Sequence, residues 1–304
     1  MLKRGLIGAG GTLGGAPAFF GPRGVFGGGT ASGTVNTISY VDIVTPADAE
    51  DFGDLTIARS ELSACSNGSR GVFGGGSFSN IIDYITIATT GNAFDFGDLV
   101  GNKTALAACS DGSRGVFGGG RNGPELSSID YIAIDTTGNA ATFGTLTEAR
   151  DLLAACSDGL RGVFGGGGNF AGYRTTIDYI TVATTGNAID FGDLTQAREA
   201  LSSASSETRG VFGGGVMSVS PFYANIIDYI TITTSGNAAD FGDLTAARRN
   251  LTACSNGDLV LFAGGDVGGP LNTIDYISIA TTGNAATFGQ LTAATYLLAA
   301  TSGG

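Results

Sequence analysis

Histidine and tryptophan are both absent from this chain of 304 residues. The missing histidine removes the commonest general base, the usual Ser–His and Cys–His nucleophile pairs, and nearly all zinc and copper sites. No stretch is long and apolar enough to cross a bilayer, so membrane insertion is not expected. Basic residues are scarce: 15 Lys and Arg against 27 Asp and Glu give a formal net charge of −12. That charge argues against binding to the phosphates of a nucleic acid.

Cysteine is also scarce, and its four copies occupy one equivalent position of an internal repeat. Two further copies of the repeat have Ala204 and Thr301 there. A position that accepts Cys, Ala or Thr is typical of a small buried slot, where free cysteine packs as a small apolar side chain. The spacing matches no zinc motif, and equivalent atoms of neighbouring units are expected to lie beyond the roughly 7 Å Cα limit of a disulfide. We therefore expect core residues, with no metal or other cofactor, at Cys65, Cys109, Cys156 and Cys254.

Glycine, by contrast, is abundant, and much of it lies in a recurring block, Arg-Gly-Val-Phe-Gly-Gly-Gly. The block begins at Arg23, Arg70, Arg114, Arg161 and Arg209, and a degraded sixth copy runs from Leu259 to Gly265. A period of about 45–50 residues predicts a solenoid or a propeller. Each copy carries signals for four strands: a small-residue strand, the glycine block, a β-branched and aromatic Ile-Asp-Tyr strand, and a weaker Asp-Phe-Gly strand. Four strands per unit is the count of a propeller blade, so the sequence predicts an all-β, six-bladed β-propeller.

The ends of the chain predict how this ring closes. The chain enters the repeat at the glycine block (24–27) and ends after the first strand of a further copy (297–301). We expect the C-terminal strand to pair beside the first glycine block and to complete the first blade. The expected domains are a Gly-rich N-terminal arm at residues 1–22, flexible or used for docking, and the propeller at residues 23–304.

The order of residues within each unit resembles the kelch repeat. Val72-Phe73-Gly74-Gly75 matches its apolar pair and glycine doublet, Tyr84 its tyrosine, and Arg59 its arginine before the next strand. Phe96 stands in place of the usual tryptophan, which makes this a divergent, kelch-like ring. Kelch-type rings are often latched by a C-terminal innermost strand, and the resemblance implies the same closure here.

The amino-acid sequence of the repeat resembles that of a second group, the glycine-rich repeat proteins encoded by marine tailed bacteriophages. The matching strings are Arg-Gly-Val-Phe-Gly-Gly-Gly, Ile-Asp-Tyr-Ile-Thr-Ile-Ala-Thr-Thr-Gly-Asn-Ala and Asp-Phe-Gly-Asp-Leu-Thr. Those proteins are generally taken to be virion or tail-fibre components. The resemblance implies a location in the virion after synthesis in the host cytoplasm, with a homo-oligomer as one possible arrangement there.

Two ladders of basic residues recur with the repeat. The first precedes each small-residue strand and is expected at the mouth of the central channel; it consists of Arg59, Lys103, Arg150, Arg198 and Arg248. An anion or acidic-glycan site is one interpretation, and pairing with the aspartates of the Ile-Asp-Tyr strands is the favoured one, because unpaired like charges would repel one another. The arginines that open the glycine blocks form the second ladder, and we expect them to be solvated.

The loops between the glycine blocks and the Ile-Asp-Tyr strands differ in length and content, whereas the strands are nearly constant. All of these loops are expected on one face of the ring, and loops on a rigid scaffold are where recognition usually resides. The candidate binding residues carry aromatic or guanidinium groups suited to contact surfaces: Arg121, Phe170, Tyr173, Arg174, Phe222 and Tyr223.

These observations together predict a non-enzymatic virion component, on tail or capsid, that binds another virion protein or a host surface glycan or receptor through these loops. The alternative is a secreted or cell-surface, lectin-like propeller that binds glycans outside the cell. An enzyme is not expected, because catalysis would need convergent carboxylates from different blades and the near-identical repeats offer no asymmetric cluster.

Overall fold

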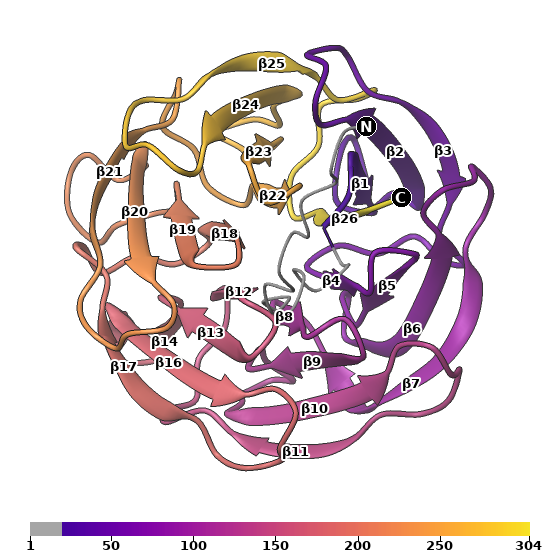
Figure 1. Ribbon diagram of the computed structural model, residues 1–304, viewed down its shortest axis with the longest axis horizontal. Helices are drawn as coiled ribbons and strands as arrows, with labels where there is room; N and C mark the ends of the chain where they lie inside the picture. The colour runs from indigo at the N-terminus through magenta and orange to yellow at the C-terminus, as the bar shows by residue number, and fades with distance from the viewer. Residues whose placement is uncertain (1–19) are drawn as a thin grey trace, which may run out of the picture.

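The computed structural model describes residues 20–304, and within them the chain forms strands and turns with no helix. Six antiparallel sheets of four strands stand side by side around a central axis, which confirms the predicted six-bladed β-propeller (Figure 1). Over this described part, no helix is available that could span a membrane. Of the predicted arm at 1–22, residues 1–19 lie outside the described residues.

We number the blades in chain order and give each from its innermost to its outermost strand. Blade 1 consists of β26 (Ala299–Gly303), β1 (Arg23–Gly27), β2 (Thr37–Asp42) and β3 (Glu50–Asp54). Blade 2 consists of β4 (Ser63–Ser66), β5 (Arg70–Gly74), β6 (Ser79–Thr86) and β7 (Phe94–Lys103). Blade 3 consists of β8 (Ala107–Ser110), β9 (Arg114–Gly118), β10 (Ser128–Ala133) and β11 (Ala141–Thr145).

The second half of the ring repeats this plan with one addition. Blade 4 consists of β12 (Ala154–Ser157), β13 (Arg161–Gly165), β16 (Thr176–Thr181) and β17 (Ile189–Asp193), and a small hairpin is inserted as β14 (Gly168–Asn169) and β15 (Gly172–Tyr173). Blade 5 consists of β18 (Ser202–Ser205), β19 (Arg209–Gly213), β20 (Ile226–Thr231) and β21 (Ala239–Asp243). Blade 6 consists of β22 (Thr252–Ser255), β23 (Leu259–Ala263), β24 (Thr273–Ser278) and β25 (Ala286–Gln290).

The two ends of the chain close the ring, as the sequence predicts. The C-terminal strand β26 pairs antiparallel with β1, with Val25 opposite Thr301. In Figure 1 the yellow end of the chain accordingly lies against its indigo beginning. Blade 1 is therefore the only one of the six whose strands come from both ends of the chain.

The glycine block is explained by how closely adjacent blades approach one another. A Cβ placed on Gly115 of blade 3 would lie 2.7 Å from Cys65 Sγ of blade 2, and one on Gly74 would lie 2.6 Å from the ring of Phe117. Both separations are shorter than real Cβ contacts allow, so only glycine admits the neighbouring side chain. The Val and Phe of each block are fully buried or nearly so, and six apolar clusters, each shared by two adjacent blades, form the core.

A ring of backbone hydrogen bonds joins the blades at one end of the axis. The residue two positions after each basic-ladder position has a left-handed backbone, with φ between 50° and 58°. Its N–H donates to the carbonyl of its counterpart in the preceding blade at 2.8–2.9 Å, and the last bond, from Glu61 to Leu297, completes the circle. The ring comprises Glu61, Ala105, Leu152, Ala200, Asn250 and Leu297. A left-handed backbone is unfavourable for a residue with a side chain, so the inter-blade bonds hold this geometry.

The serines that end the innermost strands link the blades at the opposite end of the axis. Ser66 Oγ donates to the carbonyl of Ser302 at 2.7 Å, and Ser302 Oγ donates to that of Ser255 at 2.6 Å. Ser110 and Ser205 make the same bond to the preceding blade. The scaffold is thus tied at both ends of its central channel.

Candidate functional site

The variable loops and the crossovers from one blade to the next lie together on one face of the propeller. An antiparallel blade places its second-to-third-strand loop and its exit crossover at the same end. Isolated β-bridges join the two in several blades; they include Thr104 with Arg121, Asp151 with Gly168, and Glu199 with Val216. We call this side of the ring the loop face.

Aromatic candidates from the variable loops are partly or fully open to solvent. The side chain of Phe170, at the tip of the β14–β15 hairpin, is 93% exposed, and that of Phe222 is 59% exposed. Tyr173 and Tyr223 are half-buried. Phe78, which the sequence reasoning did not select, is 50% exposed in the corresponding loop of blade 2; its position in that loop was the signal available. Aromatic side chains are enriched at protein contact surfaces.

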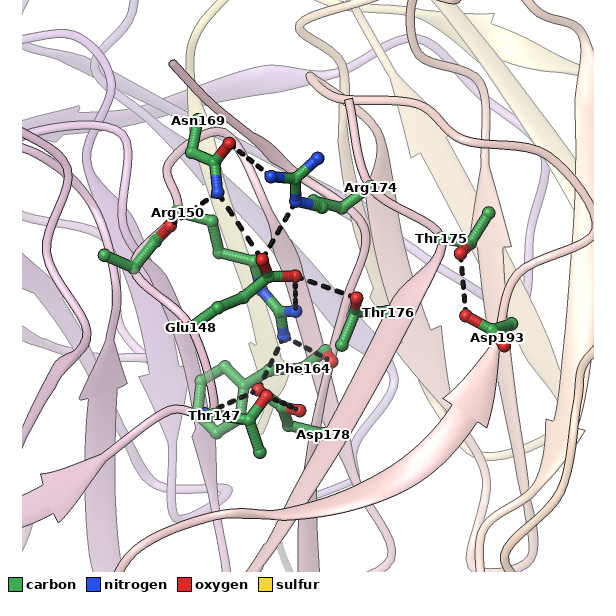
Figure 2. Close-up of polar contacts among 11 residues, drawn as sticks. Thr147, Glu148, Arg150, Phe164, Asn169, Arg174, Thr175, Thr176, Asp178 and Asp193 are labelled. Carbon is green, nitrogen blue, oxygen red and sulfur yellow. Dashed lines mark hydrogen bonds and ion pairs between the residues drawn. The ribbon is translucent and has the colours of Figure 1, made fainter. Parts of the chain in front are cut away.

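The two candidate arginines are held in ion pairs on the loop face. Arg121 bridges two blades, with Nη2 2.9 Å from Glu61 Oε1 and Nη1 2.7 Å from Asp151 Oδ2. Arg174 donates from Nε to Glu148 Oε2 at 2.9 Å and also contacts Asn169, as Figure 2 shows. Both guanidinium groups therefore shape the loops as well as presenting charge at the surface.

The basic ladder expected at the channel mouth lies elsewhere. Arg59, Arg150, Arg198 and Arg248 are completely buried, Lys103 is 3% exposed, and none of the five lines the channel cavity of about 110 Å³ between the innermost strands. Each side chain turns into its own blade, because a third-strand aspartate is buried there and needs a counter-charge. The five nitrogen–oxygen distances range from 2.7 to 3.0 Å, in the pairs Arg59–Asp83, Lys103–Asp130, Arg150–Asp178, Arg198–Asp228 and Arg248–Asp275.

Each pair is part of a clamp between neighbouring blades. A β-bulge at the Ile–Asp step of the third strand, as at Ile177/Asp178, re-aims the aspartate toward the incoming crossover. Thr147 of that crossover donates to Asp178 Oδ1 at 2.6 Å, while Arg150 donates to Asp178 and to the carbonyl of Phe164 (Figure 2). We use "clamp" for this arrangement of Arg or Lys, Asp and a crossover residue. The crossover residue is threonine in four of the five pairs, and in the Lys103–Asp130 pair it is Val100, whose N–H donates to Asp130 Oδ2 at 3.3 Å. Burial lowers the pKa of Arg150, and the charges of Asp178 and Glu148 raise it in part.

Blade 1 lacks the clamp. Ser39 occupies the aspartate position and Thr295 the arginine position, so both charges are replaced together. A cavity of about 50 Å³ remains there, lined by Phe26, Thr37, Ser39, Thr292 and Thr295 among others. The junction of blades 6 and 1 is therefore held by fewer polar contacts than the other five.

The second basic ladder is not solvated as the sequence suggested. Arg70 lies over the ring of Tyr84, 4.4 Å from its centroid, and its Nη1 donates to the carbonyl of Ile134 in the next blade at 2.8 Å. The same two contacts recur at Arg23, Arg114, Arg161 and Arg209. The regular spacing of arginine and tyrosine in the repeat could have indicated this stacking. Leu259 replaces the arginine in blade 6, so this tie is also missing at the junction with blade 1.

A third tie lies at the outer rim. The Gly-Asn turn of each blade covers the outermost strand of the preceding blade: Asn92 Oδ1 accepts from the N–H of Asp54 at 3.1 Å, and Gly91 donates to Phe52 at 2.7 Å. At the junction of blades 6 and 1, Asp48 takes the place of the asparagine. These turns protect strand edges that would otherwise offer unpaired backbone groups to another chain.

The cysteines are free and buried, each against a neighbouring blade. Burial raises the pKa of the Cys65 and Cys254 thiols to about 12. The thiolate that would act as a nucleophile or a metal ligand is therefore disfavoured. Within residues 20–304, no group of three or more His, Cys, Asp or Glu side chains is arranged to hold a metal ion.

No protein-family model matches this chain, and a comparison with curated proteins also finds no match. The geometry of the loop face is therefore the basis for assigning a function.

Proposed function

We propose that this chain is a non-enzymatic binding module whose loop face contacts another protein of a bacteriophage particle or a receptor on the host surface. The observation that carries the proposal is the contrast between constant blades and variable loops: strands recur residue by residue, while the loops differ and expose Phe78, Phe170 and Phe222. A rigid ring that presents variable side chains suits shape-complementary recognition.

The location in a virion is the second, more specific part of the proposal. It rests on the resemblance of the repeat wording to glycine-rich repeat proteins of marine tailed bacteriophages, and the kelch-like character rests on the Gly-Gly, Tyr and Arg positions described above. The ties between blades support it physically, since a component of a particle has to keep its shape.

A co-sedimentation experiment tests the loop face. The purified chain is mixed with purified phage particles or with host cells, and the bound fraction is measured for wild type and for F170A/F222A. The matched control is F94A, because Phe94 is 64% exposed but lies on β7 at the outer rim. We expect F170A/F222A to lose most of the binding and F94A to bind like wild type.

Equal binding by all three proteins, or no binding to particles or cells by wild type, would contradict the proposal. A lectin-like propeller would be favoured instead if the wild type bound free sugars saturably and did not bind particles.

A further inference from the structure

The repeats allow the charged residues of the loop face to be compared position by position. In blades 3 to 6, a crossover residue forms a β-bridge with the first residue of the variable loop. The four bridges are Thr104 with Arg121, Asp151 with Gly168, Glu199 with Val216, and Arg249 with Asp266. Blade by blade, the same two positions therefore face each other around the channel mouth.

Two of the acidic side chains at these positions form an ion pair with an arginine. Asp151 is paired with Arg121, which reaches it from the loop of the preceding blade at 2.7 Å. Asp266 is paired with Arg249 of its own blade at 3.3 Å. The Asp151–Arg121 pair shows how an acid at the crossover position is neutralised: by the first loop residue of the preceding blade.

Glu199 is the acid without such a partner. The residue of blade 4 that corresponds to Arg121 is Gly168, and a Cβ built on Gly168 would meet Glu199 Oε2. Within residues 20–304, the Glu199 carboxylate accepts no hydrogen bond and forms no ion pair. The carboxylate thus lies beside the position from which the repeat pattern would supply a guanidinium.

The surroundings of Glu199 combine burial, like charge and aromatic rings. The pKa of Glu199 is raised to about 7, chiefly by burial and also by the charge of Asp151, while Arg121 and Arg249 lower it in part. A Cβ built on Gly168 would also lie 3.5 Å from Tyr173 Cδ1, so the Tyr173 ring and the Glu199 carboxylate border the same space. Burial raises the pKa of Tyr173, and the charge of Glu199 adds to that shift. Phe170, at the tip of the same β14–β15 hairpin, is 93% exposed.

We propose that Glu199, Tyr173 and Phe170 form a docking site for the guanidinium or ammonium group of an arginine or lysine side chain on a protein partner. The carboxylate supplies the counter-charge that Asp151 supplies to Arg121. The aromatic faces add an attraction for the cation and pack against its aliphatic stem. The inference deepens the proposed function and rests on it in one respect only, that the loop face meets a protein.

The site can be tested without the partner. N-acetyl-arginine amide is titrated into the purified chain, its neutral isostere N-acetyl-citrulline amide serves as the ligand control, and the ring resonances of Tyr173 and Phe170 are followed by NMR. Two variants remove the site. E199Q deletes the charge, and G168R places the missing guanidinium within the chain at a residue whose backbone is not left-handed. The matched control variant is E207Q, in a hairpin on the opposite face.

We expect saturable shifts with the arginine derivative in wild type and E207Q, and binding weaker by about tenfold or more in E199Q and G168R, the scale of one charge-assisted contact. The citrulline derivative should give no saturable shift. Binding should strengthen between pH 6 and pH 8 as Glu199 ionises among Asp151, Arg121, Arg249 and Tyr173. Melting temperatures no lower than that of the wild type would show that the variants remain folded.

Equal shifts with citrulline, or undiminished binding by E199Q, would overturn the inference. Its failure is distinguishable from that of the proposed function. If E199Q and G168R bind particles like wild type while F170A/F222A does not, the loop face stands and this docking site falls. If arginine binds at Glu199 but no particle or host cell binds the chain, the site stands and the proposed function falls.

Discussion

Replacing the partners of one clamp, singly and together, gives the most stringent test of what holds the ring. Arg198 and Asp228 in blade 5 are both completely buried, with 3.0 Å between Nη2 and Oδ2. Asp228 also accepts from the hydroxyl and the N–H of Thr195, and Arg198 donates to the carbonyl of Phe212. Blade 1 supplies the natural substitutions, since it has threonine and serine at these two positions.

Either single change, R198T or D228S, should lower the free energy of unfolding by about 3–5 kcal/mol, because it leaves an uncompensated buried charge. The double change removes both charges and leaves mainly a cavity, so it should cost no more than about 4 kcal/mol. The coupling energy is then at least about 2 kcal/mol, well above the few tenths of a kcal/mol expected for independent sites.

The assay is equilibrium urea unfolding followed by far-UV circular dichroism, on wild type, both single variants and the double variant. Additive costs would refute the reasoning, since they would mean that the two residues contribute independently of each other. A single variant that is as stable as wild type would refute it as well.

Three further predictions concern the blade junctions and the loop face. Removal of residues 296–304 deletes β26 and two bonds of the ring of backbone hydrogen bonds between blades, and should lower the melting temperature by at least about 10 °C. A melting temperature that hardly moves in calorimetry of the shortened chain would contradict closure of the propeller by β26. A204C should lower the free energy of unfolding by about 1–3 kcal/mol, because the larger side chain overpacks against Val260. Adding V260G should recover part of that loss, because it recreates the Cys–Gly pairing of other blades. Urea unfolding that shows no recovery would contradict this packing. Since the pKa of Glu199 is raised in the folded state, its proton favours folding, and this stability is lost as the pH rises from the ordinary value of 4.5 to about 7. With a discount for its partial exposure, the loss is about 1 kcal/mol, so E199Q should be more stable than wild type at pH 8 and nearly equal at pH 4.5; the opposite order would contradict the shift.

The repeat made the architecture predictable, because blade count, strand order and closure depend on a periodic pattern that the sequence displays openly. The pairing of the basic ladder with the aspartates was also accessible, since both recur once per unit. The location of the basic ladder inside the blades was not accessible from the sequence. A turn of the backbone at the β-bulge carries the aspartate inside the blade and draws the arginine away from the channel.

Contacts between blades were the part that sequence reasoning missed. Arg70 reaches a carbonyl of the next blade, Ile134, 64 residues away along the chain, and no local pattern reports such a contact. The absence of an ion pair at Glu199 within residues 20–304 likewise depends on which side chains face each other across the channel mouth. It becomes visible only when Gly168 and Arg121 are recognised as equivalent positions in three dimensions.

Mass spectrometry of purified particles tests the central functional claim most directly. Particles are captured through this chain, and the proteins that remain attached are identified and quantified. The account predicts recovery of the chain in fixed stoichiometry with capsid or tail proteins, and loss of that association in F170A/F222A but not in F94A. Recovery of the chain only as a free protein would contradict the assignment to a virion.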